Sequence, residues 1–182
     1  MPLADLQLAG PRIASAAGEK TARKLSQMLL DVTKEQLWNP KRWWINDRNP
    51  NAVFIGRTRP GRKTYHFATG PNHEFTVGIE MIADILSSEQ AAGRWLPATE
   101  ITDRGYFGGV LSIEAVLTSV MCHEFAHCIQ YLSGRRLPKH VHDEGFYAIL
   151  DRIHASGASR TFLMSLKLAA TDDGLELAYF SS

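Results

Sequence analysis

The sequence predicts an α+β fold in which a small, mainly antiparallel three-stranded sheet packs against one buried helix and its flanking helices. Residues 75–81 alternate apolar and polar side chains, which is typical of a strand with one buried face. Residues 113–132 instead place apolar side chains at helical spacing, and Gly134 follows as a helix stop. Two short strand-like runs precede the 75–81 segment, so the sheet is expected to come before the buried helix in the chain.

The chain outside these elements divides into three parts. Residues 1–18 have no clear periodicity and predict a loosely ordered arm. Residues 19–157 are expected to form the main domain, beginning with an amphipathic helix over 19–38 that Asn39-Pro40 ends. Residues 158–182 predict a C-terminal helical extension packed on the same domain.

Two segments between the first helix and the buried helix contain turn residues. The runs 52–57 and 63–68 flank Pro60-Gly61, which suits a type II turn, and so predict a hairpin. A short helix is expected over 81–92. The glycine- and aromatic-rich stretch 94–109 predicts a long loop, either a lid or substrate wall beside the buried helix or an insertion packed on the surface.

Composition narrows the class of protein. The chain of 182 residues is 45% hydrophobic and 21% charged, with a net charge of +1, which excludes global disorder and a uniformly basic nucleic-acid-coating protein. No apolar run is long enough for a membrane span and no signal-peptide core begins the chain, so a cytoplasmic protein without membrane contact is expected. Cys122 and Cys128 point to different faces of one helix, which prevents a disulfide and predicts core packing.

The chemistry is concentrated in His123-Glu124-Phe125-Ala126-His127, an H-E-x-x-H motif on the buried helix. Residues four apart on a helix lie on one face, so both imidazoles can reach one zinc ion at about 2.0–2.1 Å. Glu124 is rotated away from the ligand direction and is placed to take a proton from a zinc-bound water. A buried cluster of this kind without a metal would leave polar groups unsatisfied, at about 1–3 kcal/mol each. The motif therefore predicts one Zn²⁺ ion with Glu124 as general base.

A catalytic zinc ion typically has three protein ligands, so the two histidines need a third. The extended metzincin pattern is excluded because Gln130 and Ser133 stand where it needs Gly and His. Downstream, a second helix ending at Gly157 is expected, and four candidate ligands lie at its start: His140, His142, Asp143 and Glu144. Spacing alone leaves all four open, although acids in a first helical turn are also favoured by the helix dipole.

The order His123-Glu124-x-x-His127, then His142, then Phe146 resembles the SprT-like zinc metalloproteases, the family that includes Spartan, in which H-E-x-x-H is followed by a His that opens H-G-x-x-F. The resemblance covers roughly residues 20–156. It implies a zincin-like fold, with His123, His127 and His142 as zinc ligands and Glu124 as general base. Asp143 stands in place of the family's Gly, and the chain carries no C-x-x-C pair for a zinc ribbon.

Basic residues are concentrated between positions 41 and 63, where seven Lys or Arg face one acid, a local net charge of +6. The expected hairpin carries four of them: Arg57, Arg59, Arg62 and Lys63. With Trp43 and Trp44 nearby, this charge predicts a phosphate-contacting surface for DNA. The alternative is a solvated hairpin tip over core tryptophans.

Together these patterns predict a zinc-dependent endopeptidase that hydrolyses protein or peptide substrates, with nucleic-acid-associated proteins as substrates if the hairpin binds DNA. The alternative is a zinc-stabilised DNA- or protein-binding module without peptidase activity, in which a fourth protein ligand closes the site.

Three tyrosines are candidates for stabilising an oxyanion: Tyr65, Tyr106 and Tyr147. Three other histidines lack partner spacing and are expected on the surface or in the core: His66, His73 and His154. The sequence leaves the oligomeric state open.

Overall fold

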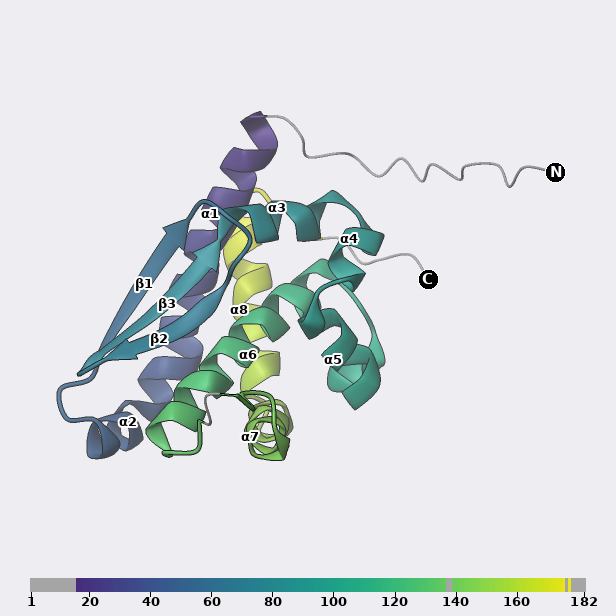
Figure 1. Ribbon diagram of the computed structural model, residues 1–182. Coiled ribbons are helices and arrows are strands. Elements are labelled where there is room, and N and C mark those ends of the chain that lie inside the picture. The colour runs from purple at the N-terminus through teal and green to yellow at the C-terminus, as the bar shows by residue number, and fades with distance from the viewer. Residues whose placement is uncertain (1–15, 137–138, 176, 178–182) are drawn as a thin grey trace.

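The computed structural model describes residues 16–136, 139–175 and 177, and it shows an α+β protein in which a three-stranded mixed sheet lies at one side of a group of helices (Figure 1). Residues 1–15 of the expected N-terminal arm lie outside the described residues. The first helix, α1, is Ala16–Thr33 and therefore begins inside that arm.

The sheet differs from the expected one in strand order. Its strands are β1 (Val53–Arg59), β2 (Tyr65–Thr69) and β3 (Asn72–Gly78), in the order β1-β3-β2. β2 pairs with β3 in antiparallel fashion, whereas β1 pairs with β3 in parallel. The prediction of a mainly antiparallel sheet is therefore wrong, and so is the hairpin between β1 and β2, because β3 lies between them. The tight turn joins β2 to β3 instead, at Gly70 with φ +57°.

The connection from β1 to β2 crosses the end of β3, and Gly78 makes this crossing possible. A Cβ atom at Gly78 would lie 2.7 Å from the carbonyl oxygens of both Gly61 and Lys63. The Gly61 carbonyl also accepts a hydrogen bond from the backbone N–H of Glu80, at 3.0 Å. The Pro60-Gly61 turn therefore carries the chain over the central strand rather than back along its neighbour.

The chain remains helical past the predicted end of the first helix. A π-helical turn (Lys34–Trp38) and a 3-10 turn (Asn39–Lys41) lead into α2 (Arg42–Arg48). The prediction that Asn39-Pro40 ends the helical region is wrong, because a proline in the first turn of a helix lacks only an N–H that would be unpaired there. α1 packs against β1 and β3, and also against helices that follow the sheet in the chain.

The segment expected as a helix followed by a long loop consists mostly of short helices. They are α3 (Ile79–Ser87), α4 (Glu89–Gly93), α5 (Leu96–Arg104) and a 3-10 turn (Tyr106–Gly109). Ser88 caps α4 by accepting from the Ala91 N–H, Pro97 lies in the first turn of α5, and Gly105 ends α5 with φ +72°. The long-loop prediction for 94–109 is therefore wrong, and α5 instead packs directly on the buried helix.

The buried helix, α6, is Ile113–Leu132 and confirms the sequence prediction. Ser112 caps its start by accepting from the Ala115 N–H at 3.1 Å, and Gly134, with φ +66°, ends it in a Schellman arrangement. Most of its residues are buried on every face, since α6 contacts β2, α5, α7 and α8 (Figure 1). Polar side chains on this helix therefore need partners inside the protein.

Two further helices complete the described part of the chain, α7 (Glu144–Ala155) and α8 (Ala158–Asp172). α7 packs across α6, and α8 packs on α1 and α6 through the buried Phe162, Leu166 and Ala170. Within the described ranges, none of the helices combines the length and apolar character needed to cross a membrane.

Candidate metal centre

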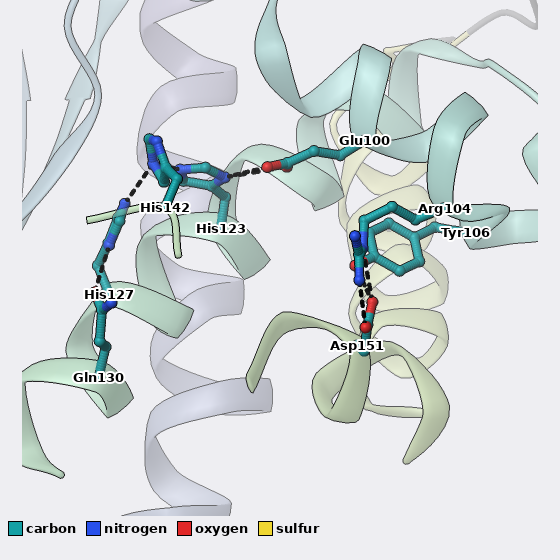
Figure 2. A network of polar contacts seen from close by, with 8 residues as sticks. All are labelled: Glu100, Arg104, Tyr106, His123, His127, Gln130, His142 and Asp151. Atoms are coloured by element: carbon teal, nitrogen blue, oxygen red, sulfur yellow. Dashed lines mark hydrogen bonds and ion pairs between the residues drawn. The ribbon is translucent and has the colours of Figure 1, made fainter. Parts of the chain in front are cut away.

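Three histidine rings converge at one point beside α6 (Figure 2). The Nε2 atom of His142 lies 3.0 Å from Nε2 of His123 and 3.1 Å from Nε2 of His127. A tetrahedral ion with metal–nitrogen bonds of about 2.0–2.1 Å would separate its nitrogen ligands by about 3.4 Å. The three nitrogens are therefore close to the spacing needed to bind a single metal ion.

Two structural elements position these rings. His123 and His127 lie on consecutive turns of α6 and are nearly buried, whereas His142 is exposed in the segment before α7. Phe146, in the first turn of α7, packs against all three imidazoles with ring centroids 4.5–5.0 Å away. The Phe146 ring therefore holds the segment that contains His142 against α6.

The structure also places the other candidates for the third ligand. Asp143 caps α7, because its Oδ1 accepts a hydrogen bond from the Phe146 N–H at 2.8 Å. His140 and Glu144 are exposed. Among the described residues, the histidine cluster contains His142 and none of these three.

The outer nitrogens of two rings have hydrogen-bond partners that the sequence analysis missed. Both carboxylate oxygens of Glu100, on α5, lie 3.0 Å from Nδ1 of His123, and Oε1 of Gln130 lies 3.3 Å from Nδ1 of His127 (Figure 2). Because Nδ1 donates to these oxygens, the Nε2 lone pairs are left to face the common point. Gln130 also donates to the Val141 carbonyl at 3.0 Å, which anchors the segment bearing His142.

Only one of these two hydrogen-bond partners could have been predicted from the sequence. Gln130 follows His127 by three residues on a helix that was correctly predicted, so helical spacing could have identified it. Glu100 lies in a segment that was expected to be a loop, and nothing in the sequence relates it to His123.

Burial also keeps the histidines in the form that binds metal. It lowers the pKa of His127 to about 3 and lowers the pKa of His142. Both imidazoles are therefore neutral at physiological pH, and only a neutral imidazole has a lone pair for a metal ion.

Glu124 projects from α6 toward the edge of the sheet. Its Oε2 accepts a hydrogen bond from the backbone N–H of His66 on β2, at 2.9 Å. Burial raises the pKa of this carboxyl to about 7, against the opposing effects of His123 and the His66 N–H. A carboxyl group with a pKa near the working pH can both accept and return a proton.

Cavities lie on both sides of the histidine cluster. One of about 400 Å³ borders Glu124 and His123 and has Tyr65 in its wall, and one of about 550 Å³ borders His142 and Tyr147. Tyr106 is held away from the cluster, since its hydroxyl donates to Oδ1 of Asp151 at 2.6 Å (Figure 2). Of the three tyrosines proposed to stabilise an oxyanion, the structure therefore places Tyr65 and Tyr147 near the site.

The basic residues at positions 57–63 do not form a hairpin tip. Arg57 and Arg59 both face Glu74 on β3, with nitrogen–oxygen distances of 2.7 and 3.9 Å. Arg62 pairs with Asp84 at 3.2 Å, and Lys63 borders the cavity next to Glu124. Two carboxylates outside the 41–63 window therefore pair with three of its seven basic residues, and contact with nucleic acid stays a prediction.

His66 and His73 lie in the core, one of the two positions expected from the sequence, and there they form a second buried group with Cys128. Cys122 is buried in the hydrophobic core, as expected.

A scan of protein-family models, a search of curated proteins and a search of solved structures each found no match to this chain. The interpretation of the site therefore depends on the side-chain geometry described above.

We expect Glu100→Gln to weaken metal binding by about 10- to 100-fold, because a neutral amide accepts the His123 Nδ1–H bond without raising the basicity of the ring. Asp103→Asn is the matched control, since it removes one negative charge from an exposed position on the same helix. Zinc affinity measured by competition with a chelator checks this. Equal affinities for the two variants would show that Glu100 has no such role.

Proposed function

We propose that this protein is a zinc-dependent endopeptidase with a zincin-like fold of the SprT-like type, acting on protein or peptide substrates. The observation that carries the proposal is the convergence of three histidine Nε2 atoms beside the buried carboxyl group of Glu124. Three imidazoles suit zinc among the biological metals, and their number matches catalytic rather than closed structural sites.

The chain's own residues can perform the proton transfers of peptide hydrolysis. Zinc, when bound, supplies a Lewis acid that polarises a carbonyl group and lowers the pKa of water. Glu124 takes a proton from the attacking water and returns it to the nitrogen of the leaving amine. The His66 N–H holds one oxygen of Glu124, so the other oxygen is left for these transfers. The Tyr65 hydroxyl is available to donate to the oxygen of the cleaved carbonyl, whereas the Tyr147 hydroxyl already hydrogen-bonds to Glu100.

The edge of the sheet supports a polypeptide substrate. β2 is an edge strand that pairs with β3 alone among the strands described, and it contacts α6 beside Glu124. An extended peptide can add to such an edge through main-chain hydrogen bonds. The exposed side chains of Tyr65 and Phe67 lie along this strand.

The competing function, a zinc-stabilised binding module, needs a fourth protein ligand to close the site. Within the part of the chain that the structure describes, the cluster offers three candidate ligands, and one of them, His142, is exposed. An open fourth position favours the enzyme.

The test is cleavage of a reduced, unfolded protein before and after metal removal. We expect cleavage by the purified protein, loss of cleavage after treatment with a chelator, and recovery on adding zinc. Cleavage that persists without metal would exclude the proposed chemistry. Zinc binding at His123, His127 and His142 without any cleavage would favour the binding module.

A further inference from the structure

A second group of metal-ligating side chains lies in the protein interior, between the sheet and α6. His66, His73 and Cys128 come from β2, β3 and α6, and their exposed fractions are 2%, 0% and 0%. In the β2–β3 pairing His66 is opposite Phe75, so His73 is its diagonal neighbour on the same face of the sheet. Cys128 approaches this pair from α6.

Two of the three distances within this second group match those of ligands around one ion, and all three atoms lie within 4.8 Å of one another. Nε2 of His66 lies 3.1 Å from Nδ1 of His73, and Sγ of Cys128 lies 3.6 Å from the same Nδ1. A tetrahedral ion with bonds of about 2.0–2.1 Å to nitrogen and about 2.3 Å to sulfur separates two nitrogens by about 3.4 Å and nitrogen from sulfur by about 3.6 Å. Close packing of the core does not by itself require three metal-ligating atoms to lie this close together.

Hydrogen bonding within the protein leaves the second group incompletely satisfied. Among the described residues, Nε2 of His66, Nδ1 of His73 and Sγ of Cys128 hydrogen-bond only with one another, and a thiol is a weak partner for an imidazole. The surroundings are aromatic: the rings of Trp38 and Tyr131 lie 5.4 and 5.9 Å from that of His73. Three polar side chains gathered in such a place are costly unless something binds them.

We propose that His66, His73 and Cys128 bind a second metal ion of the zinc class, which joins the sheet to α6. One thiolate and two imidazoles suit zinc, and the burial of all three ligands separates this ion from substrate. The fourth position is left to a small ligand such as water. Because the backbone N–H of His66 also holds Glu124, this ion would fix the strand edge against which Glu124 is positioned.

Metal binding has a defined proton requirement at this second site. Nδ2 of Asn49 lies 2.9 Å from Nε2 of His73 and also donates to the Gly70 carbonyl, so without metal the His73 proton is on Nδ1. When Nδ1 binds the ion, this proton moves to Nε2, and Asn49 then keeps its bond to the Gly70 carbonyl and gives up its contact with His73. The Cys128 thiol loses its proton to solvent, so a divalent ion releases one proton at this site.

Cobalt(II) is the probe, because only a site with a thiolate ligand gives an intense sulfur-to-cobalt charge-transfer absorption in the near ultraviolet. The His123, His127 and His142 site contains no sulfur, so wild-type full-length protein decides the question without any variant. We expect two Co²⁺ ions per chain together with this absorption. Cobalt binding without charge-transfer absorption would overturn the proposal.

Cys122 provides the matched control, since it is as buried as Cys128 and lies on the same helix. Cys128→Ser is expected to bind one ion and lose the charge-transfer band, whereas Cys122→Ser is expected to bind two ions and keep the band. Loss of the band in Cys122→Ser with its retention in Cys128→Ser would contradict the ligand assignment. His142→Ala should bind one ion and keep the band, so the second site can be judged even if the proposed peptidase activity fails.

Discussion

Glu124→Gln is expected to lower the rate of peptide cleavage by about 10²–10⁴-fold, the range for loss of a general base, while zinc content stays at the wild-type level. The amide oxygen of glutamine can still accept the hydrogen bond from the His66 N–H, so the side chain keeps its place between α6 and β2. What is lost is the group that takes a proton from water. The measurement is the initial rate on an unfolded protein substrate, with metal analysis of the same preparation.

Glu144→Gln is the control for this experiment. Glu144 was a candidate ligand from the sequence, but it is exposed in the first turn of α7 and lies outside the histidine cluster. We expect its variant to cleave at close to the wild-type rate. Equal rates for wild type and Glu124→Gln would remove the proposed mechanism, whatever the metal content.

His142→Ala is expected to lower zinc affinity by more than about 100-fold, since removal of a ligand should exceed the 10- to 100-fold effect of losing an outer-shell partner. At a free zinc concentration of about 100 times the dissociation constant, bound metal stabilises the wild type by about 2.7 kcal/mol. For a chain of this length, losing that stabilisation lowers the melting temperature by roughly 5–10 °C. His142 is exposed, so the substitution removes little packing and the zinc-free proteins should melt alike.

His140→Ala is the matched control, because it removes another exposed histidine from the same segment. We expect it to retain wild-type zinc affinity and the zinc-dependent rise in melting temperature. Melting curves of both variants and the wild type, with zinc and with chelator, check this. The opposite pattern, with zinc lost in His140→Ala and kept in His142→Ala, would refute the ligand assignment.

The helices that carry the site followed from local patterns in the sequence. The apolar spacing of residues 113–132 and the stop at Gly134 predicted α6, and the same reasoning predicted α7. Helical periodicity also predicted that His123 and His127 would lie on one face. These relations depend on residues a few positions apart, whose geometry the helix itself determines.

Errors arose where the outcome depends on contacts between distant segments. The runs on either side of Pro60-Gly61 have the composition of a hairpin, but β3, whose Phe75 and Val77 are buried in the core, pairs between them. Residues 94–109 read as a loop because their glycines and aromatics were considered without the helix-starting role of Pro97. This second error concealed the helix that brings Glu100 to His123.

The sequence by itself determined the two histidines and the carboxyl of the H-E-x-x-H motif, because one α-helical turn sets their relative positions. It narrowed the third zinc ligand to four residues in one short segment, where the resemblance to a known family favoured His142. Only the tertiary structure brought Glu100 to His123, the His66 N–H to Glu124, and Cys128 to His66 and His73. Each of these contacts joins elements between 23 and 62 residues apart, and packing of the whole core, rather than any local periodicity, decides which of them form.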